Sequence, residues 1–83
     1  MFVIEYHPNG KNGWFHAFSV NSDDAKPLLE QIEMFKEKRG QSYTTGDIVP
    51  YNNSWFGIIE AINVGNAIDK FFIKFHKELY GGK

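Results

Sequence analysis

Residues 55–80 change their hydrophobic period once, and this change constrains the fold more than any other feature of the chain. The first part is an apolar, β-prone run with Trp55, Phe56, Ile58, Ile59 and Ile62. In the second part the apolar residues have helical spacing: Ile68, Phe71, Phe72, Phe75 and Leu79. The pattern predicts a strand that is followed directly by an amphipathic helix, and this helix has the largest aromatic face in the protein.

The first half of the chain indicates the same order of elements. A strand at 2–6, a turn at 7–13 with two Asn-Gly pairs and a return strand at 14–20 predict a β-hairpin. Ser22 and the two following aspartates then favour a helix start, and Pro27 suits the first turn of a helix. Gly40 is the expected residue after the helix end, so a helix is predicted over 24–39.

The second hairpin is predicted by weaker signals. Residues 47–51 form a short β-prone run, and Pro50 cannot donate a hydrogen bond to a neighbouring strand. This run should therefore be short or lie at an edge of the sheet. Residues 52–54 predict a turn into the strand that begins near Trp55. A single helix over 54–80 is the main alternative, but Gly57, Gly65 and the β-branched residues disfavour it.

These elements predict one domain, residues 1–83, with a pseudo-repeat in which 1–40 and 46–80 each read strand, strand, helix. The expected fold class is α+β in ββαββα order. It is a two-layer sandwich with a four-stranded, mainly antiparallel sheet and two helices on one face. Local similarities between the halves, such as Trp14-Phe15 and Trp55-Phe56, are compatible with duplication or with two independent solutions to one packing problem.

Both faces of the predicted sheet are apolar, although a face that meets water should be polar. The candidate outer residues are Val3, Phe15, Ala17, Phe56, Ile58 and Ile62. An exposed apolar patch of this kind marks a contact surface. The alternative is that the sheet is strongly curled or that the loop at 40–50 covers it. The sequence leaves both interpretations open.

Composition limits the classes of function. The chain has 83 residues, no cysteine and a net charge of −1, which argues against a general nucleic-acid binder. The pattern of a signal peptide is not seen, and no apolar run is long enough to span a membrane, so a cytoplasmic location is expected. The abundance of Phe, Ile, Lys, Asn and Tyr fits AT-rich codons and suggests a low-GC bacterium, a phage or a mobile element as the source.

The histidines offer the main candidate for chemistry. His7 and His16 lie on adjacent strands of the first hairpin with Glu5 nearby, which suggests a two- or three-ligand metal site, although the spacing matches no known ligand pattern. Two histidines on a hairpin are usually unrelated. Nucleophile motifs and phosphate-binding loops are also not seen. We therefore expect no enzyme activity, no metal and no cofactor.

The sequence favours a small non-enzymatic protein-binding module, such as a phage or mobile-element inhibitor of a host protein. It would bind a protein partner or a second copy through an apolar-aromatic sheet face or the edge strand near Tyr51, with Phe15, Trp55, Phe56 and Ile58 as the expected anchors. On this view Phe56→Asp abolishes binding and leaves the fold intact. Two alternatives remain: a small-ligand, nucleotide or single-strand binder that uses stacked aromatics, and a hydrolase or metal enzyme that uses His7 and His16.

Overall fold

Four strands and two main helices make up the protein in a computed structural model that describes residues 1–8 and 13–80, with side chains described to residue 78. The strands are β1 (Phe2–His7), β2 (Trp14–Ser19), β3 (Ile48–Tyr51) and β4 (Ser54–Ile59). The helices are the short η1 (Asp23–Ala25), α1 (Lys26–Arg39) and α2 (Val64–Tyr80). The strands form one antiparallel sheet in the order β2-β1-β4-β3. The predicted α+β class and ββαββα order are confirmed.

Local sequence signals determine where the first helical segment begins and ends. The Ser22 hydroxyl accepts the Asp24 N–H at 3.1 Å, so it caps one of the free donors at the start of η1. Gly40 ends α1 in the left-handed region with φ 63°, and its N–H bonds to the Lys36 carbonyl. Glycine adopts this conformation without steric cost, which explains why the helix ends here.

The start of α2 uses a reciprocal cap that the sequence pattern did not predict. The Asn63 side-chain oxygen accepts the Asn66 N–H at 2.8 Å, and the Asn66 side-chain oxygen accepts the Ile62 N–H at 3.3 Å. This arrangement has the same logic as a capping box, with asparagine in both positions. This cap fixes the start of α2 a few residues after the end of β4.

The turn between β3 and β4 is built by two asparagines. Asn52 and Asn53 both have positive φ, 56° and 66°, which is the conformation of a two-residue type I′ hairpin turn. Asparagine tolerates this region better than most residues. The predicted turn at 52–54 is therefore confirmed, whereas residues 9–12 of the turn predicted at 7–13 lie outside the described residues.

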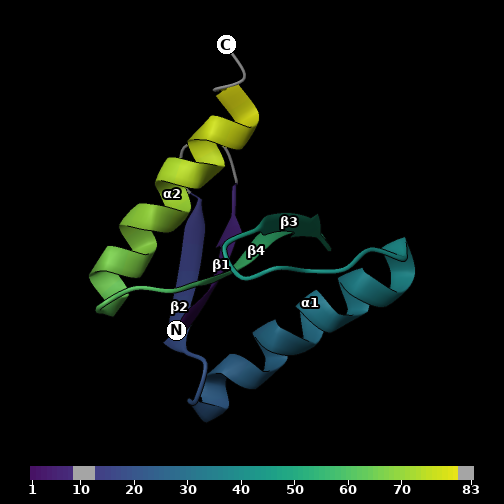
Figure 1. Ribbon diagram of the computed structural model, residues 1–83, viewed down its shortest axis with the longest axis horizontal. Helices are drawn as coiled ribbons and strands as arrows, with labels where there is room; N and C mark the ends of the chain where they lie inside the picture. The colour runs from purple at the N-terminus through teal and green to yellow at the C-terminus, as the bar shows by residue number, and fades with distance from the viewer. Residues whose placement is uncertain (9–12, 81–83) are drawn as a thin grey trace.

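The two helices cover opposite faces of the sheet, so the expectation of two helices on one face is wrong. The core cluster on the α1 side consists of Val3, Ala25, Leu28, Ile32 and Phe56. The residues buried on the α2 side are Ile4, Ile48, Ile59, Ala67, Phe71 and Phe75. In Figure 1 α1 and α2 lie apart, with the strands between them. The architecture has three layers, with α1 and α2 outside and the sheet in the middle.

The alternation of side chains along the two central strands explains this arrangement. β1 sends Val3 to the α1 side and Ile4 to the α2 side, and both side chains are completely buried. Gly57 of β4 lies on the α2 side, where an added Cβ would be 3.2 Å from the Phe71 ring. Because β1 and β4 are apolar on both faces, each face needs its own helix.

The two halves of the pseudo-repeat occupy different places in the sheet. The first hairpin has its first strand at the centre, and the second hairpin has its second strand at the centre. Trp14-Phe15 therefore lies on an edge strand, whereas the similar Trp55-Phe56 lies on a central strand. The repeat holds for the order of elements along the chain but not for their positions in space.

Candidate functional site

The two edges of the sheet, β2 and β3, differ in how well they are closed against an additional strand. In an antiparallel sheet, alternate residues of an edge strand point their backbone N–H and C=O groups away from the sheet. Such groups attract another strand unless prolines, charges or covering segments prevent it. The β2 and β3 edges differ in these protecting features, and the less protected edge is the candidate site.

The β3 edge is closed by a proline. Ile58 of β4 directs its backbone groups to the β3 side, because its carbonyl accepts the Gly46 N–H at 2.8 Å. By alternation Val49 also bonds inward, and the outward positions of β3 are Ile48 and Pro50. Pro50 has no N–H, so an incoming strand finds a gap in the row of donors. The sequence-based expectation that this strand lies at an edge is confirmed.

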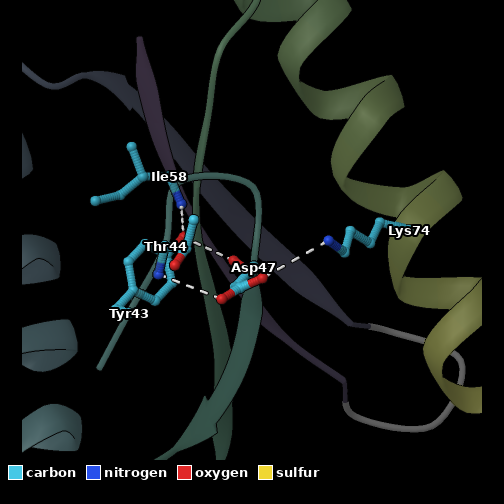
Figure 2. Close-up of polar contacts among 5 residues, drawn as sticks. All are labelled: Tyr43, Thr44, Asp47, Ile58 and Lys74. Carbon is cyan, nitrogen blue, oxygen red and sulfur yellow. Dashed lines mark hydrogen bonds and ion pairs between the residues drawn. The ribbon is translucent and has the colours of Figure 1, made fainter. Parts of the chain in front are cut away.

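Tyr43 closes the same edge of the sheet just before the first residue of β3 (Figure 2). Its hydroxyl donates to the Asp47 carbonyl at 2.6 Å and accepts the Ile58 N–H at 2.6 Å. The Asp47 carboxylate accepts the Thr44 N–H at 3.3 Å and lies 3.9 Å from the Lys74 ammonium of α2. The tyrosine hydroxyl thus takes the place of a strand partner for Ile58.

The environment of this phenol changes its acidity. Burial raises the pKa of Tyr43 to about 12 from its ordinary value of 10.0. The hydrogen bond from Ile58 lowers the pKa and the negative charge of Asp47 raises it, but burial is the largest cause. Tyr43 is therefore neutral at physiological pH and both donates and accepts a hydrogen bond. No pattern in the sequence indicated this role of Tyr43.

The β2 edge presents a row of outward backbone groups. The Val20 N–H donates to the Met1 carbonyl at 3.0 Å, which fixes the alternation of the β1–β2 ladder. Trp14, His16 and Phe18 therefore bond to β1, and the residues that point outward are Phe15, Ala17 and Ser19. The Ser19 carbonyl accepts the Ser22 N–H at 2.9 Å. Within the described residues, Phe15 and Ala17 keep both of their outward groups unpaired.

Side chains do not protect this edge. The β2 strand reads WFHAFS and contains no lysine, arginine, acidic residue or proline. It is six residues long, against four for β3. Trp14 is 41% exposed and Phe15 is 44% exposed, one on each face of the sheet. The edge therefore combines free backbone groups with apolar side chains on both sides.

An aromatic row borders the edge on the α1 side of the sheet. The Trp14 indole stacks on the His7 ring with centroids 5.1 Å apart and lies 5.0 Å from the His16 ring. His16 in turn stacks on Phe18 with centroids 6.0 Å apart. This aromatic row (Trp14, His16 and Phe18, with His7 beside it) contacts β1 and lies beside the part of the sheet that α1 covers.

On the α2 side, the β2 edge is bordered by one exposed aromatic residue, Phe15, which packs on α2. The Phe15 ring contacts Phe72 of α2 edge to face, with centroids 5.8 Å apart. Phe72 packs in the same way on Tyr6 of β1. Ala17 and Ser19 follow Phe15 on this face and are small. A strand added to β2 would find a large residue followed by two small ones.

The structure separates the four residues that the sequence predicted as partner-binding anchors. Phe15 and Trp55 lie on the α2 side, whereas Phe56 and Ile58 lie on the α1 side. Phe56 is 2% exposed and belongs to the core, and Trp55 and Ile58 are partly buried against the two cores. Phe15 alone of the four lies at the β2 edge. The apolar pattern that suggested one contact face reflects two covered faces.

Each of the two strand histidines contacts the Trp14 indole, but their polar partners differ. His16 Nδ1 lies 3.4 Å from the Glu5 carboxylate, and His7 Nδ1 lies 3.2 Å from the Ser54 hydroxyl. In residues 1–8 and 13–80 no group of three His, Asp or Glu side chains is placed to hold a metal ion. The metal or hydrolase interpretation thus gains no ligand set from this geometry.

Within residues 1–8 and 13–80, no helix has the length and apolar character that crossing a membrane requires. No family model, no curated protein and no solved structure matches the chain. The candidate site therefore rests on the geometry of this molecule, and its central feature is the open β2 edge.

Proposed function

We propose that the protein is a small binding module that docks an extended protein segment as an additional strand on β2. The observation that supports the proposal is the set of four unpaired outward groups, the N–H and C=O of Phe15 and of Ala17, within the described chain. Strand addition of this kind takes affinity from main-chain hydrogen bonds and specificity from the flanking side chains. Both ingredients lie together on β2.

The side chains beside these groups supply the apolar contacts. Trp14 and Phe15 are large, exposed and on opposite faces of the sheet, so side chains of an added strand would meet an aromatic ring on either face. Exposed aromatic residues at a docking surface contribute much of the binding energy in protein complexes. This proposal keeps the class of function expected from the sequence, and it moves the site from a sheet face or the edge strand near Tyr51 to the opposite edge strand, β2.

The direct test is Ala17→Pro. The Ala17 N–H points away from β1, so proline removes a docking donor without removing a hydrogen bond of the native sheet. Ala17→Ser, which keeps the N–H, is the matched control. Circular dichroism and the exchange of the inward amides of Trp14 and Phe18 verify that both variants remain folded.

Binding is measured with peptides selected from a random peptide library on the immobilised wild-type protein. We expect the selected peptides to bind Ala17→Pro at least roughly tenfold more weakly, as the loss of a docking hydrogen bond implies, and to bind Ala17→Ser like the wild type. They should slow hydrogen exchange at the amides of Phe15, Ala17 and Ser19. Equal binding to the proline variant, or protection confined to other elements, contradicts strand addition.

A second candidate function draws on the exposed Trp14 in the aromatic row. Bases of a nucleotide or a short single strand stack on such rings, but β2 contributes no lysine or arginine to hold phosphates. Titration with an oligothymidylate distinguishes the two candidates. Quenching of tryptophan fluorescence that is lost in Trp14→Leu and retained in Ala17→Pro favours nucleic acid over a protein strand.

A further inference from the structure

We propose that the segment docked on β2 is the β2 strand of a second copy of this chain. The two strands pair antiparallel about a two-fold axis at His16 and form a continuous eight-stranded sheet. The inference rests on the proposed strand addition at this edge and names its partner. It follows from the positions of the free backbone groups, the sizes of the side chains that would face one another, and the charge of the strand.

The free backbone groups are symmetric about His16. Phe15 and Ala17 flank this residue, and each offers an outward N–H and an outward C=O. When two such strands pair about His16, Phe15 of one copy lies opposite Ala17 of the other, and the four donors meet four acceptors. A two-fold axis at Ala17 instead directs the Phe15 N–H to the Ser19 carbonyl, which already accepts the Ser22 N–H at 2.9 Å. The register about His16 uses only groups that are free.

Side-chain sizes favour the same register. On the α2 side the large Phe15 lies opposite the small Ala17 of the other copy, so the rings do not collide. On the α1 side Trp14 lies opposite Phe18 of the other copy and extends the aromatic row across the interface. Aromatic pairs of this kind across antiparallel strands stabilise a sheet. A two-fold interface requires a surface that is complementary to itself, and β2 meets this requirement on both faces.

The charge of the strand also suits self-pairing. β2 carries no lysine, arginine or acidic residue, so pairing two copies places no permanent like charges opposite one another. The Glu5 carboxylate behind the strand lies 3.4 Å from His16 of its own chain. The chain has no cysteine, so no disulfide adds to its stability, whereas association of two folded copies would.

Cysteine cross-linking tests the register, because the natural chain has no cysteine. In the proposed pairing His16 faces itself as a non-hydrogen-bonded pair, with Cα atoms about 4.5 Å apart, which is within the range of a disulfide. His16→Cys should therefore form a disulfide-linked dimer rapidly in oxidised glutathione. Ala17→Cys is the matched control, because its two copies lie on a diagonal of about 7–8 Å and should cross-link several-fold more slowly.

Light scattering over a range of concentrations tests the association itself. The wild type should have twice the chain mass of 9.6 kDa. Ala17→Pro should weaken the dimer by roughly 30-fold, since one substitution removes two interstrand hydrogen bonds of the symmetric pair. Ala17→Ser should remain dimeric. Faster cross-linking of Ala17→Cys than of His16→Cys overturns the proposed axis.

The outcomes separate this inference from the proposed function. A wild-type monomer at all concentrations that still binds library peptides through β2 overturns the second copy and leaves strand addition intact. A monomer for which no peptide protects the β2 amides overturns both. A dimer that Ala17→Pro does not weaken overturns the inference, because that dimer then uses another surface.

Discussion

Tyr43→Phe should destabilise the protein by about 2 kcal/mol. The substitution keeps the ring, which packs against the α1-side core, and removes only the hydroxyl. Two hydrogen bonds of 2.6 Å are lost, one from the Ile58 N–H and one to the Asp47 carbonyl. Each contributes about 1 kcal/mol when its partner is left without a replacement. For a domain of this size, such a loss lowers Tm by roughly 8–16 °C.

Urea unfolding followed by circular dichroism measures the change, and amide hydrogen exchange locates it. The Ile58 amide should exchange faster in the variant, because its N–H loses its acceptor. Tyr51→Phe is the matched control: Tyr51 packs on the same core but makes no side-chain hydrogen bond within the described chain. If the free energies of unfolding of the two variants agree within about 0.5 kcal/mol and the exchange rate of the Ile58 amide is unchanged, the Tyr43 hydroxyl does not stabilise this edge of the sheet.

The pH dependence of stability provides a second signature of the same residue. Burial raises the pKa of Tyr43 to about 12 in the folded state, against 10.0 for the ordinary phenol. Between these values the unfolded state loses this proton and the folded state keeps it, so the free energy of unfolding falls as pH rises from 10 toward 12. Tyr43→Phe lacks this contribution, and its stability should approach that of the wild type over this interval. Parallel curves for the two proteins contradict the role of burial.

Two further substitutions test the three-layer core. Gly57→Ala should cost about 1–3 kcal/mol, because the new Cβ would lie 3.1 Å from the Asp47 carbonyl and 3.2 Å from the Phe71 ring; a urea midpoint equal to that of the wild type contradicts this packing. Phe56→Asp should abolish cooperative thermal unfolding, since it places a charge at a core position that is 2% exposed. A cooperative transition near the wild-type Tm would contradict the assignment of Phe56 to the core.

Local signals in the sequence were sufficient to predict the elements. Helix starts and ends, hairpin turns and the edge position of β3 depend on a few neighbouring residues, such as Ser22, Gly40 and Pro50. The energies involved are those of caps and of backbone conformation, which act within a few residues of the chain. For this reason the order and the approximate bounds of the elements agree with the structure.

The layers and the site were not predictable in the same way. The sequence shows that both sheet faces are apolar, and the correct conclusion is that both are covered, but we interpreted the second face as a contact surface. The register that separates Trp55 from Phe56 was visible in the alternation, yet Phe15 was grouped with Phe56 because the pairing of β1 with β4 was unknown. The role of Tyr43 depends on Ile58, fifteen residues away, and no local pattern marks it.

The unequal treatment of the two edges explains how a small sheet can pair once and stop. If β2 and β3 were both open, β2 of one copy could join β3 of the next, and such head-to-tail contacts continue into filaments. Pro50 interrupts the donors of β3, and Tyr43 occupies the backbone group beyond it. With the β3 edge closed, an open β2 edge can pair only with the β2 edge of another copy. The proposed two-fold axis pairs these two β2 edges with each other, and no open edge remains. The protected β3 edge therefore favours a closed dimer, because it limits what the unprotected β2 edge can build.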